Sequence, residues 1–233
     1  MVFPHACTLC GTNIDSPHSC CESCLKNITI MPKFSCASCG IPLEASLAPG
    51  PCGSCLSQTL PQQQTQHLYL YDGKVRDAIL AWKLQGQDVG LQWLLDAARQ
   101  QITSIFSPHD MLIPVPMPLH RMRRSGLHHS ADLCQKIAAI SGCAVNWKTL
   151  RRTGIDKRQS SLQGKARQQN LRQAFALSER HSKGMINDNP YRKIWVIDDI
   201  LTTGATLRHA CRVMKKTKEP IFAFSFARTW HNS

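Results

Sequence analysis

The sequence predicts an α/β domain with a mostly parallel sheet, preceded by a small cysteine-rich region. Two observations lead to this prediction. Eight of the 12 cysteines form four C-x-x-C pairs, and all of these pairs fall before residue 56. From His67 onward, short apolar runs typical of buried strands alternate with apolar residues at helical spacing, which is the pattern of βαβ units.

Within the α/β part, each element has its own signal. An apolar run that stops at a turn pair such as Asp72-Gly73 indicates a strand. Apolar residues three or four positions apart indicate one face of a helix. Strands are expected at residues 68–71, 111–113, 194–197 and 221–226, and helices over the apolar stripes at 75–82, 127–138 and 207–214.

The division of the chain follows its composition. Residues 1–60 are rich in Cys, Pro, Gly and Ser and lack long apolar runs. Such a region buries too little surface to fold unless something else holds it together. The polar stretch PQQQTQ predicts a linker at residues 61–67, followed by the larger domain at residues 68–233.

Composition also limits the class of protein. With 42% hydrophobic residues, the 233-residue chain can form a true core. No stretch approaches the roughly 18 apolar residues of a membrane span, and the start of the chain lacks the basic and apolar segments of a signal peptide. Clustered C-x-x-C pairs without a signal peptide are typical of metal ligands in a reducing compartment. We therefore expect a cytoplasmic protein without a membrane span.

The four cysteine pairs have the spacing of zinc ligands. A C-x-x-C turn brings two thiolates to one tetrahedral Zn²⁺, and a second pair completes the four ligands. Pairing in sequence order is favoured, while interleaved pairing, first with third and second with fourth, stays open; a redox dithiol is the alternative to metal. Four thiolates leave no open coordination position, so both zinc ions are expected to be structural. The expected ligands are Cys7, Cys10, Cys21, Cys24, Cys36, Cys39, Cys52 and Cys55.

Cys20 competes with its neighbour for a place among the ligands. Only Cys21 keeps the two-residue spacing to Cys24, so Cys21 is the predicted ligand.

The stretch IWVIDDILTTGAT, residues 194–206, contains an acidic pair and a threonine-rich loop. The acidic pair follows an expected strand, and the carboxyl ends of parallel strands are where ligands bind. The loop opens a helix, so its backbone N–H groups and hydroxyls are suited to a phosphate, and its glycine permits a tight turn. Because carboxylates accept hydrogen bonds from a sugar diol, the stretch predicts a sugar phosphate site. Its expected residues are Asp198, Asp199, Thr202, Thr203, Gly204, Ala205 and Thr206.

Two other interpretations of this stretch compete with the sugar phosphate site. An apolar strand followed by acids also ends a Walker B strand, but an ATPase needs a G-x-x-x-x-G-K-[ST] loop. Gly164-Lys165 is followed by Ala166, so the chain lacks that loop. The other alternative is a strand, turn and capped helix that bind no ligand.

The DDILTTGAT loop resembles the phosphoribosyl pyrophosphate (PRPP) motif of type I phosphoribosyltransferases. The chain as a whole resembles the competence protein ComF family, including its GntX-like members. Residues 125–129 depart from that family, because they are SGLHH where the family usually has RGFNQ. Besides the cysteine pairs and this loop, the likeness rests on Tyr71, Gly73, Arg76, Lys83, Pro114-Val115-Pro116, Arg121, Arg124, Arg151, Arg152, Gln159, Arg167, Asn170 and Phe175.

The resemblance implies a type I phosphoribosyltransferase-like fold behind a double zinc ribbon. It implies that Asp198 and Asp199 are the catalytic pair and contact the ribose hydroxyls, and that residues 202–206 contact the 5′-phosphate. The loop after Ile113 would lie near the pyrophosphate, and Mg²⁺ would be held mostly by oxygens of PRPP itself. Single-stranded DNA and a competence helicase are the partners that the resemblance implies.

Positive charge is concentrated in residues 121–180, which hold 13 Lys and Arg against 3 Asp and Glu, within a chain of net charge +13. We expect a mobile basic loop near the acidic pair, which either neutralises pyrophosphate or follows a nucleic-acid backbone; a solvated basic face is the alternative. Aromatic residues make up only 6%, so DNA binding should depend on the phosphates and on salt. The zinc ribbons are the rival DNA site. The expected nucleic-acid-binding residues are Arg121, Arg124, Arg151, Arg152, Arg158 and Arg167.

Three functions follow from these features. The favoured one is a cytoplasmic protein of natural transformation that binds PRPP and handles incoming single-stranded DNA. The second is a phosphoribosyltransferase that transfers ribose 5-phosphate from PRPP to an acceptor, although the sequence shows no base pocket. The third is a regulator that senses PRPP without chemistry.

Overall fold

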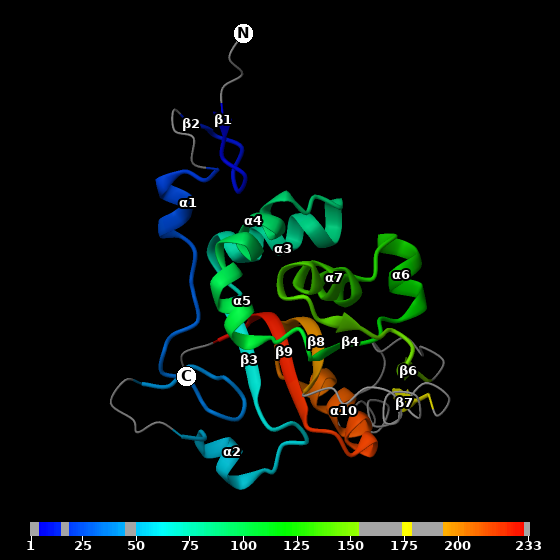
Figure 1. Cartoon of the computed structure of the whole chain (residues 1–233). Helices are drawn as coiled ribbons and strands as arrows, with labels where there is room; N and C mark the ends of the chain where they lie inside the picture. The colour runs from blue at the N-terminus through cyan, green and yellow to red at the C-terminus, as the bar shows by residue number, and fades with distance from the viewer. Residues whose placement is uncertain (1–4, 15–18, 45–49, 154–173, 179–192, 231–233) are drawn as a thin grey trace, which may run out of the picture.

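The computed structural model of the chain describes residues 5–14, 19–44, 50–153, 174–178 and 193–230. Its larger part is built on one five-stranded sheet in the order β3-β9-β8-β4-β5 (Figure 1). Every neighbouring pair in this sheet is parallel. The predicted α/β fold with a parallel sheet and an N-terminal cysteine-rich region is therefore confirmed. The strands are β3 (Thr65–Leu70), β4 (Met111–Pro114), β5 (Ala144–Val145), β8 (Ile194–Leu201) and β9 (Ile221–Arg228).

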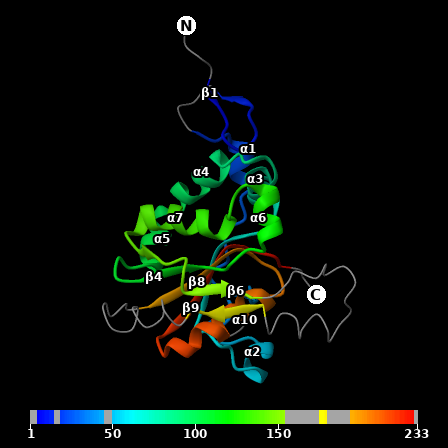
Figure 2. The same cartoon turned by 90° about the vertical axis from the view of Figure 1, so that its right-hand side faces the viewer.

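Helices cover both faces of the sheet, and each face has its own core (Figure 1, Figure 2). Side chains alternate along a strand, so Trp195 and Ile197 of β8 pack into one core, while Ile194 and Val196 pack into the other. The first face carries α3 (Gly73–Gln85), α4 (Val89–Ala97), α5 (Arg99–Ile105) and α7 (His129–Ser141). The second face carries α10 (Ala205–Met214), the 3₁₀ turn η2 (Lys215–Thr217), and a hairpin of β6 (Leu150–Arg152) with β7 (Phe175–Leu177). A short helix, α6 (Leu119–Ser125), precedes α7.

Strand β8 is longer than its sequence indicates. The sequence places Asp198 and Asp199 just beyond the strand, whereas β8 continues through both to Leu201. The reason is that β9 keeps pairing with it, with Asp198 opposite Ser225 and Leu201 opposite Arg228. The acidic pair therefore sits on a rigid strand end and not on a loop.

Strand β3 begins inside the segment expected to be a linker. Thr65 and His67 are buried and pair with Ala223 and Ser225 of β9. Because both side chains are polar, the sequence lacks the apolar pattern of a buried strand at these positions. The expected linker at residues 61–67 thus overlaps the first strand of the larger domain.

The cysteine-rich region contains the same turn twice, once in a first ribbon (residues 5–26) and once in a second ribbon (residues 35–57). In the first, Gly11 N donates to Cys7 O at 2.8 Å, and in the second, Gly40 N donates to Cys36 O at 2.9 Å. Each ribbon also has a short helix directly after its third ligand cysteine, α1 (Glu22–Lys26) or α2 (Gly53–Ser57). Strands β1 (His5–Ala6) and β2 (Asn13–Ile14) form an antiparallel pair in the first ribbon.

The segment between the ribbons covers the open edge of the sheet. Ile30 forms an antiparallel bridge with Tyr69 of β3. Met31 N donates to Leu68 O at 3.1 Å, and Leu70 N donates to Thr29 O at 2.9 Å. This pairing satisfies backbone groups that an exposed edge strand would otherwise offer to other chains.

The second ribbon packs against β3 and β9, at the same edge of the sheet, through the carbonyl oxygen of Cys39. Arg228 NH1 donates to this oxygen at 2.8 Å, and His67 Nε2 lies 3.1 Å from it. Burial lowers the pKa of His67 to about 3, so the ring is neutral. Because a carbonyl only accepts, Nε2 carries the proton, and Nδ1 lies 2.7 Å from Ser225 Oγ.

Gly40 is predicted to be essential for this packing, whereas the equivalent Gly11 is not. Both have a left-handed φ, of +68° and +72°, so alanine costs roughly 1–2 kcal/mol at either position. At Gly40 the added Cβ would also lie 2.6 Å from His67 Cδ2 and 2.9 Å from Thr65 O, whereas nothing lies within 4 Å at Gly11. Thermal unfolding of the zinc-loaded chain should therefore show a clearly larger decrease in Tm for Gly40→Ala than for Gly11→Ala. Equal losses would mean that the second ribbon does not pack against His67 in this way.

Candidate functional site

The structure brings the four cysteine pairs together in sequence order. One cluster holds Cys7, Cys10, Cys21 and Cys24, and the other holds Cys36, Cys39, Cys52 and Cys55. Within each cluster the sulfur atoms all lie within 4.8 Å of one another. Both Cys₄ sets fit structural Zn²⁺, which favours four thiolate ligands in a tetrahedron. The interleaved alternative is not what the structure has.

Backbone N–H groups support the thiolates in both clusters. Cys21 N donates to Cys7 Sγ at 3.3 Å, and Cys52 N donates to Cys36 Sγ at 3.1 Å. Burial opposes ionisation of Cys7 and Cys36, but these and other hydrogen bonds outweigh it and lower the pKa of each thiol to about 6. Hydrogen bonds of this kind, from backbone N–H groups to the ligand sulfur atoms, orient the ligands before a metal ion binds.

Cys20 lies beside the first cluster but is not one of its four ligands. Its sulfur is 3.9 Å from Cys7 Sγ, and its side chain packs into the small core of the first ribbon. Burial raises the pKa of Cys20 to about 12, so it stays a neutral thiol there.

The acidic pair lies at the carboxyl end of β8, in the middle of the sheet. Asp198 Oδ1 accepts from Ser130 Oγ of α7 at 3.1 Å and from Asp199 N at 3.0 Å. Asp199 Oδ2 forms an ion pair with Lys83 Nζ of α3 at 2.6 Å, with side-chain exposures of 14% and 22%. Helices α7 and α10, which lie on opposite faces, follow the neighbouring strands β4 and β8. This arrangement is the switch point at which parallel sheets bind ligands.

Burial raises the pKa of Asp198 to about 7, and the charge of Asp199 adds to this effect. Ionising both carboxylates at one strand end is therefore costly in the free protein. A ligand that donates hydrogen bonds to them would offset that cost.

Two histidines lie next to the acidic pair, and in the sequence they appear only as a departure from the family pattern. His129 is buried, its ring meets Trp82 edge-on at 4.9 Å, and its Nε2 has no hydrogen-bond partner among the described residues. His128 Nε2 lies 3.0 Å from Met117 N, and its Nδ1 lies 3.2 Å from Ala131 N. Burial lowers the pKa of both rings. His128 thus links the segment after β4 to the start of α7.

Thr202, Thr203 and Gly204 connect β8 to α10, and Ala205 and Thr206 are the first residues of that helix, as the sequence predicts. Gly204 is the N-cap of α10 and has a φ of +72°. A Cβ at this position would lie 2.9 Å from Arg208 NH1, which donates to Thr203 O at 2.8 Å. The positive φ favours glycine here, and a side chain at this position would also displace the Arg208 guanidinium. The side chains of Thr202 and Thr203 are exposed at the mouth of the loop.

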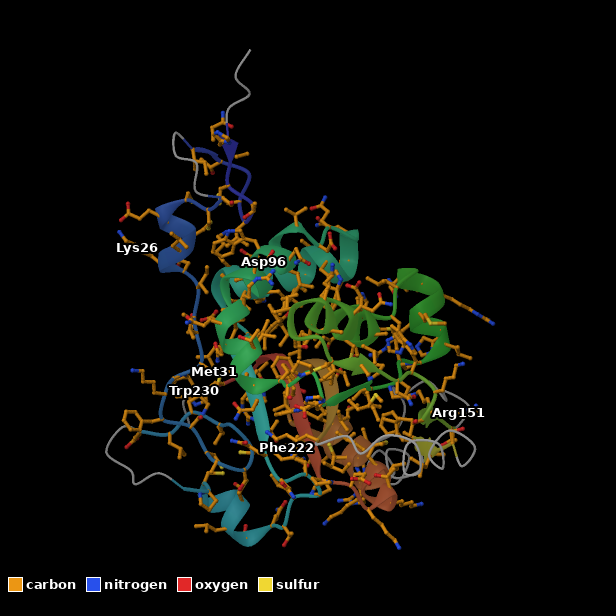
Figure 3. All side chains as sticks on the ribbon, viewed as in Figure 1. Lys26, Met31, Asp96, Arg151, Phe222 and Trp230 are labelled. Carbon is orange, nitrogen blue, oxygen red and sulfur yellow. The ribbon has the colours of Figure 1, made fainter. Side chains whose placement is uncertain are left out.

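The predicted basic residues lie on two elements. Arg121 and Arg124 are exposed on α6, and Arg151 is exposed on β6. Figure 1 and Figure 2 show both elements on the same side of the molecule, and Figure 3 shows Arg151 at its edge. The Arg152 guanidinium lies 5.6 Å from the centre of the Phe175 ring. The other two predicted residues, Arg158 and Arg167, and the basic loop to which they belong lie outside the described residues.

Comparison with known proteins agrees with this arrangement. Residues 1–56 match the double zinc ribbon domain. Over 223 residues, which are 92% of each chain, the sequence is 29% identical to competence protein F of Haemophilus influenzae. The resemblance to the ComF family is confirmed. DNA utilization protein YhgH of Salmonella typhimurium is also similar to this chain, with 27% identity over 223 residues and the same coverage as competence protein F.

None of the helices in the described part of the chain is long and apolar enough to cross a bilayer.

Zinc analysis tests the ligand assignment. The intact chain should carry two zinc ions, because each Cys₄ set supplies a full tetrahedron. Cys21→Ser should lose one zinc and unfold the first ribbon, whereas Cys20→Ser should keep both. Metal content and thermal unfolding under reducing conditions measure the two effects. The assignment would be contradicted if the intact chain carried less than one zinc. It would also be contradicted if Cys20→Ser lost a zinc while Cys21→Ser kept both.

Asp198 makes stability depend on pH. Its pKa rises from an ordinary 3.8 when unfolded to about 7 when folded, so the folded state keeps the proton longer. The stability of the wild type should therefore fall as pH rises from about 4 to about 7. Asp198→Asn keeps an acceptor oxygen without the charge and should raise Tm at pH 8 by at least about 2 °C, with a smaller gain at pH 4. A gain that does not change with pH would contradict the raised pKa.

Proposed function

We propose that this chain binds PRPP at the end of β8 and handles incoming single-stranded DNA in the cytoplasm during competence or DNA uptake. The observation that carries the PRPP half is the placement of Asp198 and Asp199 at the end of β8, one short loop before the N-terminus of α10 and at the switch point of the sheet. The pair offers acceptors for a ribose diol, and the loop at 202–206 offers donors for its 5′-phosphate. A sugar and a phosphate can therefore be recognised within one short segment.

The ion pair between Lys83 and Asp199 supports this proposal. In the absence of ligand, Lys83 partly neutralises the carboxylate at 2.6 Å. A ribose hydroxyl that binds Asp199 would leave the ammonium group beside the ligand, where it suits a diphosphate. Lys83 is thus suited to exchange its ion pair with Asp199 for one with the diphosphate when PRPP binds.

Magnesium would come with PRPP. Within the described residues, groups of three or more ligating side chains occur only at the two Cys₄ clusters. The acidic pair therefore supplies too few groups for a cage of its own, and Mg²⁺ characteristically keeps phosphate oxygens and water as ligands. The ion would neutralise the diphosphate while Asp198 and Asp199 orient the ribose.

Two observations support the DNA half of the proposal. The relatives of this chain are named for competence and for DNA utilization. Helix α6 and strand β6, which carry exposed arginines, lie on the same side of the molecule (Figure 2), and these arginines belong to residues 121–180, which hold ten more basic than acidic residues. Such a surface binds phosphates whatever the base sequence.

Calorimetric titration with PRPP and Mg²⁺ tests the sugar phosphate site. Asp199→Ala removes a charged acceptor, and such a loss costs roughly 1.5–3 kcal/mol, so affinity should fall about tenfold to hundredfold. Asp96→Ala is the matched control, because Asp96 pairs with Arg99 on the surface and should not affect PRPP. Equal affinities for the two variants would refute the site.

Salt titration tests the DNA surface. Each phosphate neutralised on a single strand contributes about −0.7 to the slope of log affinity against log salt. Exchanging both Arg151 and Arg152 for Glu should weaken oligothymidine binding and flatten this slope. The control exchanges Lys26 and Arg99 for Glu, which changes the net charge equally at other surfaces. If the control has the larger effect, the DNA surface lies elsewhere, with the first ribbon as the leading alternative.

A further inference from the structure

The solvent side of helix α10 carries positive charge at positions that the sequence analysis did not assign to any site. Residues 205–218 hold five Lys and Arg and no Asp or Glu. Positions three or four apart share one side of a helix, so four of these cations lie along α10 and the 3₁₀ turn η2 that continues it. On the opposite side, Leu207 and Met214 are buried in the core of that face. We call the four cations the α10 basic row: Arg208, Arg212, Lys215 and Lys216.

The α10 basic row lacks acidic partners. Within the described part of the chain, none of its four residues forms an ion pair with a carboxylate. Arg212 NH1 lies 3.0 Å from His209 Nδ1, and because a guanidinium only donates, this ring nitrogen accepts. Like charges four residues apart destabilise a helix. A polyanion that binds along the row would remove this cost.

The row connects the phosphate loop with the hairpin that carries the predicted DNA residues. At its start, Arg208 NH1 donates to Thr203 O at 2.8 Å, and both residues line a cavity of about 220 Å³ between the second ribbon and the start of α10. Farther along, α10 packs beside the hairpin of β6 and β7, which carries Arg151 (Figure 1, Figure 2). At a rise of 1.5 Å per residue, positions 208 to 216 span about 12 Å. The row is therefore long enough to contact more than one phosphate of a strand.

A flexible polyanion fits this row better than an anionic membrane does. A helix that lies in a membrane interface buries its apolar face among the lipids. The apolar face of α10 is already buried against the sheet, and the exposed large hydrophobic residues of the described chain lie on other elements. Single-stranded nucleic acid, in contrast, follows positively charged surfaces with its phosphates.

We propose that the α10 basic row binds the phosphates of single-stranded DNA and guides the strand between the β6 arginines and the phosphate loop. This inference rests on the DNA half of the proposed function and adds a surface that lies outside residues 121–180. Because the row contacts the backbone, its binding should not depend on the base sequence.

Fluorescence anisotropy of a labelled oligothymidine, measured at several salt concentrations with the full zinc-loaded chain, tests the row. The α10 triple variant combines Arg212→Gln, Lys215→Gln and Lys216→Gln, and leaves Arg208 in place beside the phosphate loop. If each of the three contacts one phosphate, the slope of log affinity against log salt should become shallower by about 2. The affinity at low salt should fall about tenfold or more.

The control triple variant combines Lys26→Gln, Lys33→Gln and Arg99→Gln. It removes the same charge from exposed positions on other elements and should leave the slope close to that of the wild type. Thermal unfolding verifies that both variants are folded. Cations near the end of a helix also stabilise its dipole, but a purely structural role of this kind would not change the salt slope.

The pair Arg151→Glu and Arg152→Glu, measured alongside, separates failure of the row from failure of the proposed function. If this pair weakens oligothymidine binding and the α10 triple variant changes the slope no more than the control does, the row is overturned and the proposed function stands. If the α10 triple variant alone flattens the slope, the row is confirmed and the β6 arginines are not part of the DNA surface. If the wild type does not bind oligothymidine, both proposals fail. An α10 triple variant that loses binding to phosphatidylglycerol vesicles but keeps that to oligothymidine would identify a membrane as the partner and overturn the DNA row.

Discussion

The carbonyl oxygen of Cys39 joins the zinc-bound part of the molecule to its sheet. It accepts from His67 of β3 and from Arg228 of β9, and its own residue belongs to the second Cys₄ cluster. The metal that orders the ribbon thereby also fixes the position of the ribbon on the sheet. The burial of His67, the need for Gly40 and the cavity beside α10 all depend on this contact.

Strand β8 places the acidic pair at one end of the same sheet. Pairing with β9 holds Asp198 and Asp199 in a rigid strand, although two adjacent carboxylates repel each other and are partly withdrawn from water. Lys83 and Ser130 reduce this cost from the α3 and α7 side of the sheet. Such a loss of stability is common where function requires it, and it agrees with the ligand site proposed at this strand end. The acidic pair and the cavity therefore depend on different elements around one sheet, because α3 and α7 support the acidic pair while the second ribbon and α10 enclose the cavity.

Local features were predictable from the sequence, whereas features that depend on distant partners were not. The spacing of the C-x-x-C pairs identified both metal clusters, because a chelating turn is a local structure. The stretch from Ile194 to Thr206 identified the strand, the turn and the helix start for the same reason. The beginning of β3 at Thr65 was missed, because its pairing partner in β9 lies more than 150 residues away along the chain. Likewise, nothing in the SGLHH segment indicated that His128 would contact Met117, since only the fold brings these residues together.

Hydrogen exchange of the full chain with and without the second zinc site tests the central role of the Cys39 contact most directly. Cys52→Ser removes a ligand of that site, and Cys21→Ser, which removes a ligand of the first, is the control. The account predicts faster amide exchange at residues 62–70 and 201–207 in Cys52→Ser, with α7 still protected, and changes confined to the first ribbon and its neighbours in Cys21→Ser. Unchanged protection at residues 62–70 and 201–207 in Cys52→Ser would contradict it.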